Sequence, residues 1–393
     1  MEIERKIHSQ ILKTLKRGKS ILLFGPRQVG KTTLLKSIKC DLFIQLAQRS
    51  VRLRYERNPS LIEGELQALY KIKKSKVFVI IDEIQKVPEF MDPIQDFIDQ
   101  GIAQFILTGS SARKLRRQSE MNLLPGRIVT YRLDPFSLSE LDQPNLKNLL
   151  LYGSLPGIYL DETTQNMDED LRSYVDTYLD EEIRVESQVR RLEPFARFLE
   201  LAGIEAGRLL NLNEISKDLG ISRATLTNYL EILIDTLIIE RIEPITVSTN
   251  RKKLIKSSRF LFFDLGVRRF CANEGIGPTP ERYGQLFEQF VGVELLREMR
   301  LTLPAGRLRF WSDPDGPEVD WVIDINGTYI PIEVKWTSTP NNRDAKHLIT
   351  FMDEYKSTQG FIICQTPNPI LINDQITAIN WQALRNLEFL NLV

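Results

Sequence analysis

A glycine-rich segment near the N-terminus constrains the fold of this chain more than any other feature. It follows an apolar run, Ile21–Phe24, that predicts a buried strand, and it precedes a stretch, Thr33–Ile38, that predicts a helix. The segment fits the pattern G-x-x-x-x-G-K-T, in which glycines let successive backbone N–H groups point inward at phosphate oxygens. The sequence therefore predicts a phosphate-binding loop, made of Gly25, Pro26, Arg27, Gln28, Val29, Gly30, Lys31, Thr32 and Thr33.

Such a loop predicts that ATP or ADP binds here together with Mg²⁺. Lys31 is expected to reach the β- and γ-phosphates, and Thr32 to offer its hydroxyl to the metal. A strand expected at Val77–Ile81 ends in Asp82, a second candidate metal ligand, and Glu83, a candidate catalytic residue that would orient or deprotonate the attacking water. The alternatives are a glycine-rich turn without a ligand and a solvated strand end. The order of strand, loop and helix disfavours both.

Two further side chains are candidate catalytic residues. A strand expected at Phe105–Thr108 ends in hydroxyl residues, Thr108, Ser110 and Ser111, which could bind the γ-phosphate or the water. Ordinary turn chemistry explains these hydroxyls equally well. Arg127 could neutralise the charge of the transition state, in its own subunit or across an interface, and a surface arginine is the alternative.

The first 140 residues alternate apolar runs with polar helical stretches. Uninterrupted apolar runs suit strands that are buried on both faces, so we expect an α/β fold with a parallel sheet covered by helices. The five expected strands are Ile21–Phe24, Leu42–Leu46, Val77–Ile81, Phe105–Thr108 and Ile128–Leu133.

Length and composition predict a multidomain cytoplasmic protein. A chain of 393 residues exceeds one ordinary core, and the patterns predict three domains, at residues 1–145, 146–248 and 249–393. Basic and acidic residues balance at 52 each, so binding to nucleic acid would need a local patch. The apolar runs are strand-sized, which predicts no membrane contact. Three distant cysteines give neither a disulfide framework nor a zinc site, which favours a reducing compartment.

The middle of the chain predicts a helix-turn-helix followed by a β wing. The turn lies at Gly220, and the second helix is expected at Ser222–Asp235. A basic segment that ends at Arg259 could contact DNA phosphates, although winged helices also serve as protein-docking or self-association modules. The possible DNA contacts on the second helix are Arg223, Thr225, Thr227 and Asn228. The basic residues of the segment are Arg251, Lys252, Lys253, Lys256 and Arg259.

A hairpin near the C-terminus predicts a second group of acidic residues. Asn326-Gly327 is typical of a two-residue turn, and a turn there places Asp320 opposite Glu333. Lys335 lies on the same face as Glu333 because side chains alternate along a strand. Two carboxylates and a lysine suit Mg²⁺ or Mn²⁺, and a satisfied polar patch is the alternative. Pro331 lacks a backbone donor, which suggests an edge strand.

Taken in order, these motifs resemble a family of prokaryotic AAA-type P-loop ATPases. The stretches that carry the resemblance are GPRQVGKTTLL, VFVIIDEIQKVPEF, FILTGSSARKL, LPGRIVTYRLDPFSLSEL, YVDTYLDEEIRVE, LNEISKDLGISRATLTNYLEIL, FLFFDLGV and EVDWVI…IEVK. The resemblance implies an ATPase domain, a winged helix and a restriction-endonuclease-like α/β C-terminal domain. It also implies a nuclease-type site at Asp320, Glu333 and Lys335, with Glu288 as an additional acid.

The function predicted from the sequence is Mg²⁺-dependent ATP hydrolysis coupled to a module that contacts DNA. One alternative is a nucleotide-gated switch that binds DNA or protein, with slow or no hydrolysis and an inactive nuclease-like domain. Another is a metal-dependent nuclease driven by the ATPase. The sequence leaves these alternatives open, because a fold that carries a motif can host many functions.

Overall fold

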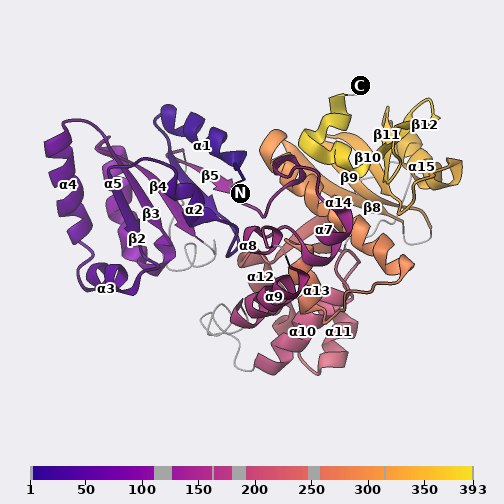
Figure 1. Ribbon diagram of the computed structural model, residues 1–393, viewed down its shortest axis with the longest axis horizontal. Helices are drawn as coiled ribbons and strands as arrows, with labels where there is room; N and C mark the ends of the chain where they lie inside the picture. The colour runs from indigo at the N-terminus through magenta and orange to yellow at the C-terminus, as the bar shows by residue number, and fades with distance from the viewer. Residues whose placement is uncertain are drawn as a thin grey trace. The chain divides into compact units, whose positions relative to one another are not determined.

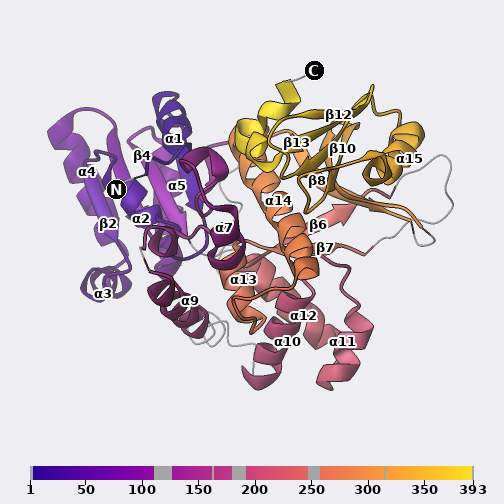
Figure 2. The ribbon, with the colours of Figure 1, turned by 45° about the vertical axis from the view of Figure 1, so that its right-hand side comes forward.

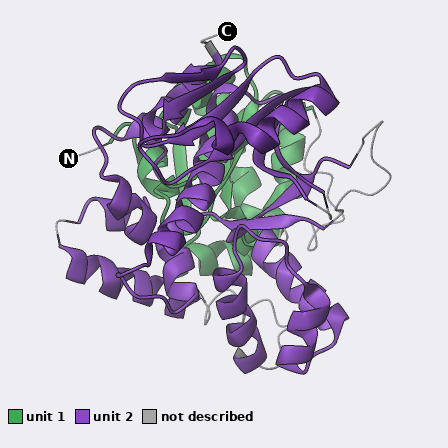
Figure 3. Ribbon diagram, turned by 90° about the vertical axis from the view of Figure 1, so that its right-hand side faces the viewer, with its two compact units in different colours: residues 1–135, 235–237 green, residues 136–234, 238–393 purple. Residues whose placement is uncertain are grey.

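The computed structural model describes residues 3–109, 126–161, 163–178, 192–246, 257–313 and 316–391. The chain divides into two compact units (Figure 3). Unit 1 comprises Met1–Pro135 with Asp235–Leu237, and unit 2 comprises Phe136–Ile234 with Ile238–Val393. The division of the chain into three domains stays a prediction. One sheet of unit 2 contains strands from both sides of the expected border near residue 248.

Unit 1 is built on a five-stranded sheet whose order is β2-β3-β4-β1-β5 (Figure 1). Every neighbouring pair is parallel. The strands are β1 (Ser20–Phe24), β2 (Leu42–Gln45), β3 (Val77–Asp82), β4 (Ala103–Gly109) and β5 (Ile128–Arg132). The parallel sheet predicted from the apolar runs is therefore confirmed, with strand ends that differ by one or two residues.

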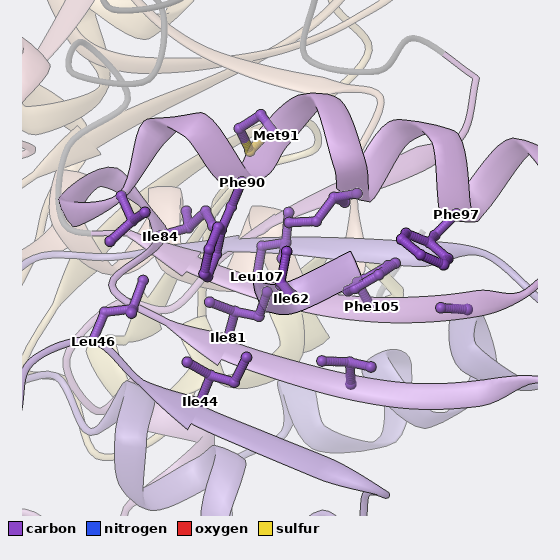
Figure 4. Close-up of a cluster of buried hydrophobic side chains, with 14 of the residues drawn as sticks. Ile44, Leu46, Ile62, Ile81, Ile84, Phe90, Met91, Phe97, Phe105 and Leu107 are labelled. Carbon is purple, nitrogen blue, oxygen red and sulfur yellow. The ribbon is translucent and has the colours of Figure 1, made fainter. Parts of the chain in front are cut away.

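The helices of unit 1 cover this sheet and explain its apolar strands. Side chains of α3, α4 and α5 pack with alternate residues of β2, β3 and β4 in one buried cluster (Figure 4). Phe90, which precedes α5, lies edge-on to Tyr55 of α3 in this cluster. Each large apolar side chain buried here contributes roughly 1.5–3 kcal/mol to stability. The helices are α1 (Ile7–Lys16), α2 (Lys31–Lys36), α3 (Arg49–Arg57), α4 (Leu61–Lys73) and α5 (Met91–Asp99), with 3₁₀ turns η1 (Ile84–Lys86) and η2 (Pro88–Phe90).

Unit 2 contains an eight-stranded mixed sheet, in the order β12-β13-β11-β10-β9-β8-β6-β7. The pairs β6–β8, β10–β11 and β11–β13 are parallel, and the others are antiparallel. The strands are β6 (Ile239–Pro244), β7 (Arg259–Phe262), β8 (Gly306–Ser312), β9 (Glu318–Ile325), β10 (Thr328–Val334), β11 (Gly360–Cys364), β12 (Ile370–Asn373) and β13 (Ile376–Asn380).

The hairpin β9–β10 has the register predicted from its turn. Asn326 and Gly327 both have positive φ values, 52° and 89°, and Thr328 pairs with Ile325. The interpretation of Pro331 as a sign of an edge strand is wrong, because β10 lies between β9 and β11. The pairs with β11 begin one residue later, at Ile332, so the ladder accommodates the missing donor.

Helices lie on both faces of this sheet (Figure 2). The helix α15 packs with Trp311 and Val322 in one apolar cluster, whereas α14 meets the next side chain of β9, Trp321. A Cβ atom at Gly292 of α14 would lie 2.6 Å from the Trp321 ring, so a glycine is required for this close approach. The helices α7 to α12 precede the strands of unit 2 in the chain, whereas α13, α14 and α15 lie between strands. The helices are α7 (Leu146–Tyr152), α8 (Pro156–Tyr159), α9 (Thr164–Tyr178), α10 (Leu192–Ile204), α11 (Leu212–Leu219), α12 (Arg223–Asp235), α13 (Leu265–Cys271), α14 (Pro280–Thr302) and α15 (Lys346–Tyr355), with 3₁₀ segments η3 (Leu138–Glu140), η5 (Asn342–Ala345) and η6 (Trp381–Asn391).

The helices α11 and α12 lie where the sequence predicts two helices, and the winged-helix domain itself stays a prediction. Gly220 ends α11 in the left-handed conformation, and the hydroxyl of Ser222 accepts a hydrogen bond from the N–H of Thr225 at 3.1 Å. The antiparallel strands β6 and β7 follow in the chain. None of the helices in the described ranges is long and apolar enough to cross a membrane.

Candidate functional site

The predicted phosphate loop connects the end of β1 to the start of α2. Gly30 has a φ of 90° and Gln28 a φ of 61°, so the backbone curls tightly before the helix begins at Lys31. Gly25 lies against the end of β5, where an added Cβ atom would be 2.4 Å from the carbonyl oxygen of Leu133. The first glycine of the motif is therefore fixed by close packing as well as by the turn.

The side chain of Lys31 folds back over the loop. Its exposed fraction is 6%, and its Nζ atom donates to the carbonyl oxygens of Gly25 and Pro26 at 2.8 Å each. An ammonium group at this position lies among the backbone groups that are predicted to surround the phosphates. Carbonyl partners are neutral, so an anionic phosphate would compete for the ammonium effectively.

Two hydroxyl groups hold the completely buried Asp82 at the end of β3. The Oγ1 atom of Thr32 donates to Oδ2 of Asp82 at 2.7 Å, and the Oγ1 atom of Thr108 donates to Oδ1 at 2.5 Å. Since these residues come from α2, β3 and β4, three segments meet at the carboxyl ends of the strands. The two side chains predicted to hold Mg²⁺, Thr32 and Asp82, are therefore in direct contact, and hydroxyl and carboxylate oxygens are ligands that Mg²⁺ prefers.

Glu83 follows Asp82 in a strained conformation, with φ 64° and ψ 48°. Its N–H donates to Oγ1 of Thr108 at 3.0 Å, and its carboxylate accepts from Nε2 of Gln85 at 2.5 Å. A left-handed glutamate costs of order 1–3 kcal/mol and is typical of functional sites. The half-buried carboxylate is thus held beside the predicted metal site by a neutral amide.

The two other candidate catalytic residues have different outcomes. Arg127 directly precedes β5, and Ile128 of that strand pairs with Ser20 at the start of β1. Since the phosphate loop follows the opposite end of β1, Arg127 cannot complete the site in its own subunit, and its guanidinium is paired with Asp99. A role across an interface stays a prediction. Ser110 lies outside the described residues.

Sequence reasoning missed two residues near the loop. Arg5 donates to the carbonyl oxygen of Val29 in the loop at 2.7 Å and to that of Asp134 at 2.6 Å. No local pattern could have identified it, because Asp134 is 129 positions away. The second is Gln85, which lies two positions after Glu83 in a stretch that the motif already marked. Thr108, one of the hydroxyls predicted near the end of its strand, donates to Asp82.

In unit 2, the predicted acidic residues and lysine form what we call the carboxylate cluster, defined as Glu288, Asp320, Glu333 and Lys335. Nζ of Lys335 donates to Oε1 of Glu333 at 2.6 Å. Oδ2 of Asp320 accepts from the N–H of Val334 at 2.8 Å. Glu288 projects from α14, whereas Asp320 and Glu333 come from β9 and β10.

Arg259 contacts this cluster, which the sequence did not predict. The sequence suggested a phosphate contact for it, and this interpretation is wrong, because its exposed fraction is 4% and it pairs with Glu288 at 3.1 Å and Glu318 at 3.0 Å. Its guanidinium also lies 4.6 Å from the ring centroid of Phe310, a cation–π contact. The other basic residues of that predicted segment, 251–256, lie outside the described residues.

Burial dominates the electrostatics of the carboxylate cluster. Removal from water, reinforced by the charge of Asp320, raises the pKa of Glu288 to about 8 and holds the pKa of Glu333 well above its usual range. Burial also raises the pKa of Asp320. Burial acts against the charged form of Lys335, but Glu333 and Asp320 outweigh it and raise the pKa of the ammonium. These carboxyl groups therefore retain protons more readily than exposed ones.

The structure gives no separate sign of a metal at the carboxylate cluster. Over the described residues, no group of three or more His, Cys, Asp or Glu side chains is arranged to hold a metal ion. A nuclease-type metal site at the cluster stays a prediction. Glu294, six residues after Glu288 on α14, binds Arg297 at 2.6 Å and the N–H of Leu138 at 2.9 Å, and so belongs to a different network.

The four candidate DNA contacts of α12 divide into two pairs. Arg223 and Thr227 line a cavity of about 500 Å³. Thr225 is engaged in the helix cap, where its hydroxyl lies 2.8 Å from that of Ser222. Asn228 is half-buried.

Three family models match consecutive parts of the chain. The first, described as an AAA domain, matches residues 17–142. The phosphate-loop unit is therefore similar to AAA-type P-loop ATPases. Two others, described as domains of unknown function (DUF8612 and DUF4143), match residues 143–276 and 283–384. The AAA match thus spans the loop and the strands around it, and the other two assign no function to unit 2.

Relatives in distant organisms extend along most of the chain. An uncharacterized protein of Mycobacterium tuberculosis, Rv2008c, is 23% identical over 354 residues, which cover 87% of this chain and 76% of the relative. An uncharacterized protein of Methanocaldococcus jannaschii, MJECL04, is 26% identical over 400 residues, which cover 86% and 87% of the two chains.

Solved structures give only remote matches. A signal transduction ATPase with numerous domains and a tetratricopeptide repeat sensor, PH0952 from Pyrococcus horikoshii, matches with 13% identity and a TM-score of 0.29. The match covers 77% of this chain and 47% of that protein, so this chain spans about half of its length. The Drosophila ORC bound to AT-rich DNA and Cdc6 matches with 10% identity and a TM-score of 0.26, over 68% of this chain and 89% of that one. Neither score is high enough to support an argument about function.

Proposed function

We propose that unit 1 binds ATP with Mg²⁺ on the loop from Gly25 to Thr33 and hydrolyses its terminal phosphate bond. The observation that carries the proposal is the 2.7 Å hydrogen bond between Thr32 and Asp82, which joins the start of α2 to the end of β3. This contact brings the two predicted metal ligands together, beside a loop that has the backbone shape for phosphates. The match of residues 17–142 to an AAA domain supports nucleotide binding independently.

Different residues of unit 1 would have different roles in phosphoryl transfer. Lys31 would exchange its two carbonyl partners for the β- and γ-phosphate oxygens, since charge-assisted hydrogen bonds are stronger than neutral ones. Mg²⁺, held by Thr32 and Asp82, would neutralise charge that develops on the phosphates. Glu83 would orient the attacking water and accept its proton, a contribution of roughly 10²–10⁴ in rate. Thr108 holds both Asp82 and the backbone of Glu83 in position.

Two substitutions with matched controls test this function. Lys31→Ala should abolish ATP binding, and Glu83→Gln should bind ATP but lower turnover about 100-fold or more. Lys36→Ala and Glu89→Gln remove the same charges from exposed positions of unit 1 and should leave both properties unchanged. Calorimetry measures binding, and phosphate release measures turnover. Normal turnover in both site variants would contradict the proposal.

A nucleotide-gated switch with slow hydrolysis is the second candidate. The bond from Gln85 to the carboxylate of Glu83 favours it, because a carboxylate engaged by an amide is less available to water. Gln85→Ala should then raise the rate of phosphate release severalfold, whereas Gln100→Ala, a change in an exposed glutamine of the same unit, should not. An unchanged or lower rate in Gln85→Ala would favour a role in orienting Glu83 for hydrolysis instead.

A further inference from the structure

A cavity of about 500 Å³ lies within unit 2, between α12 and the strands β6 and β7. The face of α12 that lines it carries Arg223, Thr227 and Leu230, which are spaced by four and three residues and so share one side of the helix. Arg241 of β6 and Phe260 of β7 line the opposite wall. None of these residues belongs to the phosphate loop or to the carboxylate cluster.

The charge of the cavity lining has one sign. Arg223 and Arg241 line it, and no aspartate or glutamate does. Both arginines are exposed, and neither forms an ion pair with any residue in the described ranges. The chain as a whole has no net charge, so this concave surface is a local concentration of positive charge. Low-dielectric walls such as Leu230 and Phe260 strengthen the attraction of such a surface for anions.

The two guanidinium groups are positioned by different elements. Arg241 pairs directly with Phe260 across the β6–β7 ladder, and its Cζ atom lies 5.8 Å from the ring centroid of Phe260. Arg223 is the first residue of α12, and the hydroxyl of Thr227 follows one turn later. The hydroxyl of Ser258, which also lines the cavity, donates to the carboxylate of Glu243 at 3.0 Å, so the two guanidinium groups are the charged donors that remain for a ligand. A planar guanidinium donates two parallel hydrogen bonds to a phosphate, so two of them in one cavity suit a phosphodiester group.

We propose that this cavity binds the phosphodiester backbone of double-stranded DNA, with Arg223 and Arg241 as the phosphate ligands. Arg223 begins the second helix of a helix-turn-helix pair, and phosphate contacts at such a helix fix the position of the protein on a duplex. Contacts of this kind do not read bases, so the binding is independent of sequence and depends on salt. The proposal concerns unit 2 and does not require ATP hydrolysis.

The test uses fluorescence anisotropy of the full chain with a labelled DNA duplex, without nucleotide, at several KCl concentrations. Arg223→Ala and Arg241→Ala should each weaken binding about three- to tenfold and lower the slope of log Kd against log salt by about 0.9, as expected for one lost phosphate contact. Arg307→Ala, which removes an exposed arginine of β8 outside the cavity, should match the wild type. Circular dichroism establishes that each variant is folded.

Two further arms separate DNA from other carriers of phosphate. A fluorescent adenine nucleotide added to the Lys31→Ala chain reports binding outside the phosphate loop. Nucleotide binding there that is lost in Arg223→Ala or Arg241→Ala would assign the cavity to a small nucleotide and overturn the proposal. Wild-type failure to bind the duplex would also overturn it, as would folded variants with unchanged affinity and slope. Loss of slope in both variants, with Arg307→Ala unchanged, supports it.

Discussion

Each unit holds carboxylates near the end of a buried strand, but the two groups have opposite kinds of partner. Asp82 of unit 1 accepts hydrogen bonds from two neutral hydroxyls, those of Thr32 and Thr108. The carboxylate cluster of unit 2 is in contact with fixed positive charges instead, since Lys335 binds Glu333 and Arg259 binds Glu288. Hydroxyls orient a carboxylate and leave its charge for an incoming cation, whereas guanidinium and ammonium groups already neutralise it.

An acidic residue at a strand end is therefore not by itself a metal site. The nature of its partners decides whether a cation is needed. In unit 1 the hydroxyl partners of Asp82 carry no charge that could balance its carboxylate. The loop beside it is shaped for anionic phosphates, which would accompany a metal. In unit 2 the structure has already balanced the acids by burial, raised pKa values and two basic side chains.

The largest effect is expected for loss of the unbalanced charge in unit 1. Asp82→Asn keeps an acceptor for one hydroxyl but removes the charge that would hold Mg²⁺, so ATP turnover should fall about 10³-fold, or about 4 kcal/mol. The corresponding change in the other unit, Asp320→Asn, should leave ATP turnover within about twofold, since its partners lie in unit 2. Phosphate release at saturating ATP measures both. Equal losses of turnover in the two variants would show that the two carboxylates act in one site, and would contradict the distinction between Asp82 and the carboxylate cluster.

The sequence predicts the two groups of carboxylates but not most of the partners that distinguish them. The motif predicted the loop, and apolar runs predicted the five strands of unit 1, because both signals are local. The Asn326-Gly327 turn likewise predicted the register of β9 and β10. Arg259 is 61 positions before Asp320, and the pairing of β6 with β8 that brings these segments into one sheet has no local signature.

Composition was misleading at two positions. Arg259 directly follows the basic segment in sequence, yet it is the first residue of β7, a strand whose four residues are all buried, and it pairs there with Glu288 and Glu318. An arginine near the nucleotide could neutralise the charge of the transition state. The parallel pairing of β5 with β1 nevertheless places Arg127 at the end of the strands opposite the phosphate loop. In both cases the chemical type of the residue was informative only after the direction of its strand was known.

The next effect concerns the basic partner within unit 2. Arg259→Met removes a buried guanidinium and leaves Glu288 without its ion pair, so the free energy of unfolding should fall by about 3 kcal/mol at about pH 9, above the pKa of about 8 that burial gives Glu288. Arg307→Met, at an exposed position, should cost less than about 0.5 kcal/mol. Urea denaturation measures the change. The double variant Arg259→Met with Glu288→Gln should recover part of the loss, and no recovery would mean that packing on Phe310, rather than charge, gives Arg259 its role.

A smaller effect should appear as a pH dependence of unit 2. Burial raises the pKa of Glu288 from about 4.5 to about 8, so between these values the folded state binds more protons than the unfolded state. The stabilisation is therefore complete below the lower pKa and is lost as the pH rises through the upper one.

The variant Glu288→Gln has no proton to lose, so it isolates this contribution. From about pH 5 to about pH 9, the wild type should lose roughly 1–2 kcal/mol of stability relative to the variant. The full shift is not expected, because 28% of the side chain is exposed and Arg259 favours its charged form. Urea titrations at several pH values measure the difference. A constant difference across this range would contradict the raised pKa, and Glu281→Gln, at an exposed position of α14, is the control.

The smallest effect is expected at Arg5, which holds the phosphate loop from outside. Hydrogen bonds from its side chain reach the backbone oxygens of Val29 and Asp134, and each contributes roughly 0.5–1.5 kcal/mol. Arg5→Ala should weaken ATP binding about three- to tenfold and leave the turnover of bound ATP unchanged, because Arg5 contacts neither the predicted metal ligands nor Glu83 in these bonds. Arg17→Ala, at an exposed position of unit 1, should alter neither. If turnover fell together with affinity, the loop would have to move during the reaction. The position of Asp82, which its hydroxyl partners hold, would then depend on the backbone of the loop as strongly as the carboxylate cluster depends on its charged partners.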